Sequence, residues 1–577
     1  MRVKLARTAG FCMGVRRAIE IVLTEANRNQ GPIFTFGPLI HNRQVMDLLE
    51  SKGVGVIEDT SRLGEGTLVI RAHGIPPQQR KILKASGMKL IDATCPHVAR
   101  VQSLIRYHAN KGFRAVIVGD VTHPEVIGLV GYGNGAVEVI KGPAEVDALP
   151  EADQLIVVAQ TTQDAERYRE AADRIKERFP HALIFETICD ATLNRQAEVR
   201  SIASQVDGLV VVGGFHSGNT RRLVQVARGA GVPVFHVETD EALDKKSLSA
   251  MEVIGVTAGA STPNWMIKNV VQKIEAIQSR TESRFGRMIR DLLKTLFLSN
   301  IMVASGAFSL AYAATILMGR EPDFLHPFLA FLYIYAMHVL NRFLDKGAST
   351  YNDPERARFY RRHRIWFFHT GIGAIVAALV LSFFLGSTVL LAMAGLSLLG
   401  MVYSIPVVPV SKRLIWRYSK IKDIPGSKTF SQALAWAALI SLLPLLEPVA
   451  ISWGPTLLSF FFVFAMVYVR SALFEIFELQ GDLIVGRETL PIALGEKRTF
   501  LLLKGIILVG GLVLAVAPLV CSVCAFSYLL LPCFLSLTLT LLAYERRWLY
   551  PGTRLEAMVE GNLFLAGLLA LCWHLLS

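Results

Sequence analysis

Three isolated cysteines stand in the first half of the chain, each inside a short polar turn. Cys12, Cys95 and Cys189 are far apart in the sequence, and none belongs to a Cys-x-x-Cys pair. Three thiolates brought together from distant segments could hold three irons of a 4Fe-4S cluster and leave the fourth iron open to a substrate oxygen. On the cysteines alone, burial as small apolar side chains is the more usual alternative.

The segments around these turns predict an α/β fold. Apolar β-rich runs at residues 115–120, 155–159, 209–214 and 254–260 each end in a polar turn and continue into a helical pattern. This alternation predicts parallel sheets covered by helices on both faces, with ligands at the carboxyl ends of the strands. Ser217, Asn219 and Ser261 stand in such turns, where they could bind a phosphate-like anion or only cap a helix.

Three histidines and one glutamate stand in similar turns. His41, His73 and His123 follow apolar runs, and histidines at such positions could neutralise a diphosphate, although a lone histidine is usually structural. Glu125 follows His123 by two residues, where a carboxyl group could deliver protons.

These turns form an ordered series of motifs from Met1 to about Gln278. The series consists of residues 11–15, 41–42, 72–74, 92–96, 123–125, 160–162, 188–196, 217–223 and 259–263. It resembles that of 4-hydroxy-3-methylbut-2-enyl diphosphate reductase, the last enzyme of the non-mevalonate isoprenoid pathway.

The resemblance implies an α/β trefoil of three lobes around a 4Fe-4S cluster, with Cys12, Cys95 and Cys189 as its ligands. It implies that the substrate's 4-hydroxyl group is removed to give isopentenyl or dimethylallyl diphosphate, with two electrons from a ferredoxin- or flavodoxin-type donor. The diphosphate would be bound by His41, His73, His123, Ser217, Asn219 and Ser261. Glu125 would supply protons beside His123, and Thr161 or Thr162 would orient the hydroxyl group.

The second half of the chain consists of long apolar segments. The 577-residue chain has a mean hydropathy of +0.41, and its apolar residues concentrate after about Leu293. Nine segments approach the ~20 residues that span a bilayer: 293–318, 327–344, 365–385, 387–408, 430–446, 455–477, 500–520, 521–543 and 558–576. We therefore expect a domain at 1–278, a basic linker at 279–292, and an all-α membrane domain of about nine helices at 293–577.

The net charge of +13 is explained by basic residues at the ends of these segments. No basic stripe with interleaved aromatic residues is present, so we expect contact with membrane lipid and no nucleic-acid partner. The basic loops precede the first apolar segment and follow the second, fourth, sixth and eighth, so they lie on one side of the membrane. The start of the chain does not have the pattern of a secretory signal peptide. The pattern predicts a multi-pass protein of the inner (cytoplasmic) membrane, with the first domain in the cytosol and the C-terminus outside.

Two loops beside the apolar segments carry acidic residues, at 341–356 and 475–491. Carboxylates four residues apart could hold Mg²⁺ that bridges diphosphate oxygens, or could form a solvated helix end. With residues 403–406 and 422–425, these loops resemble the two acidic motifs of the UbiA-type intramembrane prenyltransferases.

That resemblance implies nine helices and a prenyl diphosphate site that includes Asn341, Arg342, Asp345, Glu478 and Asp482, with Mg²⁺ as a candidate cofactor. The first motif departs from the family, because Arg342 stands where an acid is expected and Ser349 replaces another. A cation there would attract a phosphate and repel a metal.

The sequence thus predicts an iron-sulfur reductase fused to a UbiA-like membrane domain. Two alternatives stay open. The membrane domain could be only an anchor or a binding module for an isoprenoid lipid, or the whole chain could be a prenyltransferase with a degenerate reductase domain.

Overall fold

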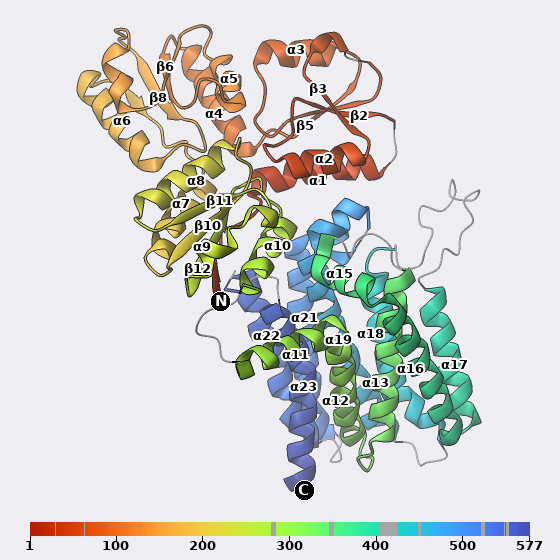
Figure 1. The fold of residues 1–577 in the computed structure, drawn as a ribbon. Coiled ribbons are helices and arrows are strands. Elements are labelled where there is room, and N and C mark those ends of the chain that lie inside the picture. Colours follow the sequence, from red (N-terminus) through yellow and green to blue (C-terminus); the bar gives the residue numbers. More distant parts are fainter. Residues whose placement is uncertain are drawn as a thin grey trace. The chain divides into compact units, whose positions relative to one another are not determined.

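The computed structural model forms two compact units, Met1–Glu282 (the α/β unit) and Ser283–Ser577 (the helical unit) (Figure 1). The described residues are 1–28, 31–62, 64–277, 284–344, 351–403, 424–447, 452–487, 489–520, 525–546, 548–549 and 553–576.

The α/β unit contains three parallel sheets of four strands each. The first has the order β3-β2-β4-β5, with β2 at Ile33–Phe36, β3 at Val54–Ile57, β4 at Thr67–Ile70 and β5 at Lys89–Asp92. The second has the order β7-β6-β8-β9, with β6 at Arg114–Val118, β7 at Val137–Ile140, β8 at Leu155–Ala159 and β9 at Leu183–Ile184. The third has the order β1-β12-β10-β11, with β1 at Arg2–Leu5, β10 at Gly208–Val212, β11 at Val234–Val237 and β12 at Val253–Ala258.

The three sheets share one strand order. In each lobe the second strand lies outside the first, and the third and fourth follow on the other side; in the third lobe β1 takes the fourth place, after β12. The central strands β8 and β10 are completely buried, as expected for apolar strands covered on both faces. The predicted parallel sheets are therefore confirmed, and each lobe offers equivalent strand ends for a site.

Ten helices of this unit connect and cover the strands. They are α1 (Met13–Asn27), α2 (Arg43–Ser51), α3 (Pro77–Ala85), α4 (Pro96–Ala109), α5 (Pro124–Val130), α6 (Ala165–Arg178), α7 (Asp190–Ala203), α8 (Gly218–Gly229), α9 (Lys245–Leu248) and α10 (Asn264–Glu275). Short 3₁₀ turns lie at Thr60–Arg62, Pro143–Ala148 and Asp240–Ala242.

The helical unit is entirely α-helical in its described part. Its helices are α11 (Arg284–Leu298), α12 (Ile301–Leu317), α13 (Leu325–Leu344), α15 (Pro354–Arg362), α16 (Arg364–Leu385), α17 (Ser387–Val402), α18 (Ser427–Ala437), α19 (Trp453–Val485), α20 (Leu490–Leu494), α21 (Glu496–Val520), α22 (Ser527–Glu545) and α23 (Thr553–Leu576). A π turn at Ala438–Leu442 and a 3₁₀ turn at Leu443–Leu446 continue α18.

Six helices of the described chain are long and apolar enough to cross a membrane: Arg364–Leu385, Ser427–Leu446, Trp453–Val485, Glu496–Val520, Ser527–Glu545 and Leu555–Leu576. The pair α11 and α12 would make a seventh if it formed one span. A helical domain with several candidate spans is thus present, and the number nine stays a prediction.

The first predicted span, 293–318, is not one straight helix. α11 ends at Leu298, α12 begins at Ile301, and the two are bent by 76°. Asn300 lies between them in the left-handed region with φ of 63°, a conformation that asparagine adopts more readily than most residues. Residues 284–292 of the predicted linker belong to α11.

Candidate active site and the polar cluster of the helical unit

Each lobe places one cysteine after its fourth strand. Cys12, Cys95 and Cys189 follow β1, β5 and β9, and each is the N-cap residue of the next helix, α1, α4 or α7. The Val15 N–H donates a hydrogen bond to the Cys12 sulfur at 3.5 Å, and the Cys189 sulfur lies 3.1 Å from the Thr192 hydroxyl oxygen. Helix N-termini carry partial positive charge, which favours thiolates and an anionic group that they hold.

The three thiols lie close enough to influence one another's charge. Burial raises the pKa of Cys95 and Cys189, and the charge of Cys12 raises both further. All three are free cysteines. Gly14 permits this approach, because a Cβ atom there would lie 2.5 Å from the Cys95 sulfur.

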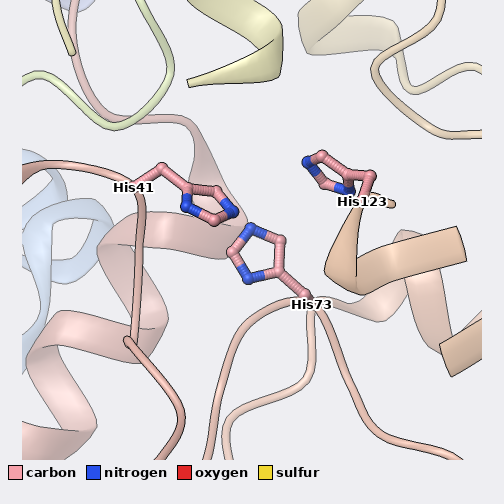
Figure 2. A group of neighbouring side chains, drawn as sticks. All are labelled: His41, His73 and His123. Atoms are coloured by element: carbon pink, nitrogen blue, oxygen red, sulfur yellow. The ribbon is translucent and has the colours of Figure 1, made fainter. Parts of the chain in front are cut away.

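Three histidines meet at other strand ends (Figure 2). His41 follows β2 and His123 follows β6, and each of these is the first strand of its lobe. His73 follows β4, the third strand of the first lobe. Their ring centroids are 4.7 to 5.6 Å apart, and one nitrogen from each lies within 4.8 Å of the others. The structure therefore brings these three predicted residues together.

The third lobe contributes hydroxyl and amide groups to the same place. Ser217 caps α8 after β10, and the Cβ of a residue at Gly218 would lie 3.4 Å from the His123 ring. Ser261 follows β12, and its hydroxyl donates to the His41 carbonyl oxygen at 3.3 Å. Asn219 is buried, and its Nδ2 has no hydrogen-bond partner among the described residues.

Glu125 is buried in the first turn of α5, where it contacts Thr161. The Thr161 N–H and hydroxyl donate to its two carboxylate oxygens at 2.7 and 3.0 Å. Burial raises the pKa of Glu125 to about 7, and the bonds from Thr161 act against this rise. Thr162 instead accepts a hydrogen bond from the Gln160 side chain at 3.0 Å, so only Thr161 is joined to the acid.

The charges around the histidines suit an anion. Burial lowers the pKa of all three imidazoles, that of His123 to about 4. Arg71 lowers the pKa of each of them further, and Arg221 lowers those of His41 and His123. Positive charges on this side of the site attract an anion and repel a metal ion. The sequence analysis did not assign Arg71 or Arg221, although both stand close in sequence to assigned residues.

The first acidic motif of the helical unit has a cation within it. Asn341 and Arg342 lie in the last turn of α13, and Asp345 lies outside the described residues. The Arg342 guanidinium carbon lies 5.4 Å from the centre of the Tyr360 ring. No ion pair of Arg342 is found in the described part of the chain, so its positive charge is not neutralised there by a contacting carboxylate.

The second acidic motif is helical, not a loop. Glu475, Glu478 and Asp482 lie on one face of α19, which continues to Val485. Each carboxylate has a partner in the protein: Glu475 accepts from the Leu490 N–H at 3.1 Å, Glu478 pairs with Lys428 at 3.6 Å, and Asp482 accepts from the Asn352 amide at 3.0 Å. Lys428 interacts electrostatically with all three acids, and Glu478 also interacts with Arg342.

A further polar network, which the sequence analysis missed, lies deeper between the helices. Arg470 of α19 and Glu560 of α23 form a buried ion pair, with Nε to Oε2 at 3.0 Å. Ser471 donates to the Gln432 side chain at 3.0 Å, which in turn lies 3.3 Å from His338. Buried ionisable groups within apolar helices are costly unless they are paired, and they usually mark functional interiors.

Comparison with known proteins separates the same two parts of the chain. The LytB protein family model matches residues 3–275, and the VviA prenyltransferase model matches residues 306–576. Over 289 residues the chain is 43% identical to the 4-hydroxy-3-methylbut-2-enyl diphosphate reductase of Opitutus terrae, covering 48% of this chain and 100% of that protein. The chain belongs to the LytB family.

Two solved structures cover one part each. The structure of E-1-hydroxy-2-methyl-but-2-enyl-4-diphosphate reductase from Plasmodium falciparum is 30% identical, covers 49% of this chain and 89% of that one, and has a TM-score of 0.46. The structure of a UbiA homolog from Archaeoglobus fulgidus bound to DMAPP and Mg²⁺ is 17% identical, covers 48% of this chain and 99% of that one, and has a TM-score of 0.35.

The cysteines of this LytB-family unit fit an iron-sulfur cluster. Soft thiolate ligands suit iron-sulfur centres, and here three free thiols from three lobes approach one another. Their shared position at helix N-termini would also stabilise the negative charge of such a centre.

Within the described residues, the acidic cluster of α19 is paired with groups of the protein itself. Apart from the three histidines, the described residues hold no group of three ligand side chains gathered closely enough for one ion. The Lys428 ammonium supplies positive charge to the three acids of α19. Among the described residues, Glu475 Oε1 and Asp482 Oδ2 are buried without hydrogen-bond partners, so these two oxygens could still accept a cation.

Proposed function

We propose that the α/β unit reduces 4-hydroxy-3-methylbut-2-enyl diphosphate to isopentenyl and dimethylallyl diphosphate. The observation that carries this proposal is that three equivalent cysteines and the diphosphate-type side chains stand at corresponding strand ends of three lobes. In the balanced reaction, two electrons and two protons enter, the C4–O bond breaks, water leaves, and one proton ends on carbon. A ferredoxin- or flavodoxin-type protein supplies the electrons one at a time.

Cys12, Cys95 and Cys189 would hold a 4Fe-4S cluster, which supplies electrons and a Lewis-acidic iron for the leaving hydroxyl when it is bound. Each of the three cysteines is the N-cap residue of its helix, so the three thiols fix the position that the cluster would occupy. The histidines lie at other strand ends and leave the thiols to the cluster.

The diphosphate binds between His41, His73 and His123 on one side and Ser217, Asn219 and Ser261 on the other. Buried donors without partners, at Asn219 Nδ2 and at nitrogens of His41 and His73, support this assignment. The N-terminus of α8 provides further backbone N–H groups for an anion. A bound diphosphate would raise the pKa of the histidines again, so that each can donate a hydrogen bond.

Glu125 gives its proton towards the substrate through Thr161, with His123 beside it. A carboxyl group with a pKa near 7 is well matched to proton transfer at neutral pH. The hydroxyl of Thr161 contacts Glu125 and can also orient the substrate's hydroxyl group, whereas the hydroxyl of Thr162 contacts Gln160.

The decisive experiment is an anaerobic preparation of the full chain, measured for iron and acid-labile sulfide and for turnover with a reduced dye as donor. Cys12→Ser, Cys95→Ser and Cys189→Ser should each lose the cluster absorbance and most turnover. Cys572→Ser, at an exposed cysteine of the helical unit, is the matched control and should keep both. Full iron content and turnover in all three variants would contradict the assignment of the cluster ligands, whereas a wild type without iron and without turnover would favour a degenerate reductase domain.

For the helical unit we propose that it binds a prenyl diphosphate through protein cations rather than through Mg²⁺. Arg342 and Lys428 both interact electrostatically with Glu478, and both could contact phosphate oxygens directly. Asn341, Asp345 and Asp482 complete the site that the UbiA resemblance suggests. If prenyl transfer is slow or absent, the helical unit serves as a membrane anchor or as a binding module for an isoprenoid lipid.

The proposal also covers how the helical unit crosses the membrane. We propose nine membrane helices in the inner membrane, with the α/β unit and the basic loops in the cytosol, the C-terminus outside, and a boundary between the units near residues 279–292. Protease protection of a C-terminal tag in spheroplasts and in inverted vesicles tests the orientation.

A further inference from the structure

Helix α11 has an apolar face and a basic face. Its apolar side chains recur at spacings of three and four residues: Phe285, Met288, Ile289, Leu292 and Leu293. Arg287, Arg290 and Lys294 alternate with them and fall on the opposite side of the helix. Such a pattern usually buries the apolar side against the protein and leaves the charges in water.

The orientation of α11 is the reverse of that pattern. Phe285, Met288 and Leu292 are 67, 60 and 57% exposed, whereas Arg287 and Lys294 are only partly exposed. Lys294 forms an ion pair with Glu355 of α15, so the charged side faces the protein at this end of the helix. A continuous exposed apolar face of this kind requires a covering surface.

The direction of α11 indicates what that surface is. α11 is bent by 76° from α12, which enters the apolar helices, so it runs across the end of a helix of the bundle (Figure 1). The bend is held by Asn300, whose Nδ2 donates to the Tyr360 hydroxyl of α15 at 2.6 Å. A helix with this direction and a lipid-compatible face at the end of a bundle lies in the plane of the bilayer surface.

We propose that α11 binds the surface of an anionic lipid bilayer. Phe285, Met288 and Leu292 insert among the outer parts of the acyl chains. Arg287 and Arg290, on the other side of the helix, extend to the level of the lipid phosphates, as long basic side chains do at membrane interfaces. Because α12 continues directly from α11, the bilayer that surrounds the bundle also covers this face. This proposal depends on neither proposed activity.

The test is photo-crosslinking in the full chain, reconstituted into vesicles of phosphatidylcholine with or without phosphatidylglycerol. A photoreactive benzoyl-phenylalanine replaces Met288, with Arg287 on the opposite face as the matched control. Phe384 of α16, which is 78% exposed, is the lipid-facing reference. Mass spectrometry of the adducts then identifies what covers each position.

We expect lipid adducts at positions 288 and 384 and mainly adducts within the chain at position 287. The adduct yield at 288 should rise several-fold with phosphatidylglycerol, and Arg287→Gln with Arg290→Gln should remove that rise. An unchanged yield of lipid adducts at position 384 checks that the helical unit of this double variant is folded.

Three outcomes would overturn the proposal. Adducts of position 288 with the α/β unit would show that this unit covers α11, and adducts with a second copy of the chain would show an interface between copies. Lipid adducts at 384 without any at 288 would show that α11 does not reach the bilayer. Equal yields with and without phosphatidylglycerol would remove the anionic part of the proposal.

Discussion

Replacement of Glu125 by Gln tests the proton route most directly. The amide keeps the size of the side chain and can still bond to Thr161, but it cannot release a proton at neutral pH. Turnover should fall by a factor on the order of 10² to 10⁴, the usual contribution of a positioned general acid. The cluster absorbance should stay, because Glu125 is not a proposed cluster ligand.

The pH dependence gives the same prediction a sharper form. Glu125 has a pKa of about 7, raised by burial from the ordinary value of 4.5. The acid is therefore about nine-tenths protonated at pH 6 and about one-tenth protonated at pH 8, so turnover limited by this proton should fall about tenfold over that range. Thr161→Val removes a hydrogen bond that stabilises the charged carboxylate, so the fall should move to higher pH.

The raised pKa also predicts a stability change with a definite sign. The folded state favours the neutral carboxyl, so it binds more protons than the unfolded state between pH 4.5 and about 7. The free energy of unfolding should therefore decrease as pH rises through this window, by about 3 kcal/mol in total at 1.36 kcal/mol for each pKa unit. Glu125→Gln should lack this contribution.

The assay is anaerobic turnover with a reduced dye at saturating substrate from pH 5.5 to 8.5, together with thermal unfolding of the same samples. Glu138→Gln is a matched control, because Glu138 belongs to the same lobe but is partly exposed and paired with Arg114. Wild-type turnover in Glu125→Gln, or an unchanged pH profile in that variant, would refute the reasoning.

Three further predictions concern other parts of the chain. Gly14→Ala should lose the cluster, because its Cβ would meet the Cys95 sulfur, whereas Gly229→Ala, with open space around its Cα, should retain it; iron content distinguishes them. Arg221→Gln should raise KM several-fold with little change in kcat, because the charge attracts the diphosphate; equal losses in both would indicate another role. Lys428→Ala should weaken Mg²⁺-free binding of a prenyl diphosphate on the order of tenfold, and Arg342→Asp should make that binding Mg²⁺-dependent; binding that is wholly Mg²⁺-dependent in wild type would contradict the proposed role of both cations.

The strands of the α/β unit were predictable because they are short, apolar and followed by turn residues. Residues 155–159 are strand β8 as predicted, and the run at 209–214 overlaps β10, which spans Gly208–Val212. The pairing of β1 with β12 was not predictable from periodicity, because it joins segments about 250 residues apart through backbone bonds alone. The same holds for Arg71, whose role depends on which lobes lie beside it.

The sequence predicted less of the helical unit. Hydropathy finds apolar segments but does not reveal where a helix bends, so the break at Asn300 was missed. The acids of α19 were found by their spacing, yet the cation that pairs with Glu478 comes from Lys428, fifty residues earlier. Only the folded chain shows that these charges are neighbours, and this is the basis for the proposal that protein cations bind the diphosphate.

The repeated lobes explain why a single acid is sufficient. The second helical position after the first strand is Gln44 in one lobe, Glu125 in the next and Asn219 in the third. Two neutral amides and one carboxyl thus stand at equivalent places around the site. A carboxylate at Gln44 or Asn219 would repel the diphosphate, whereas Glu125, bonded to Thr161, is the one proposed proton source in an otherwise repeated framework. The reaction needs this asymmetry, because the proton must arrive at one end of the substrate while the diphosphate is held at the other.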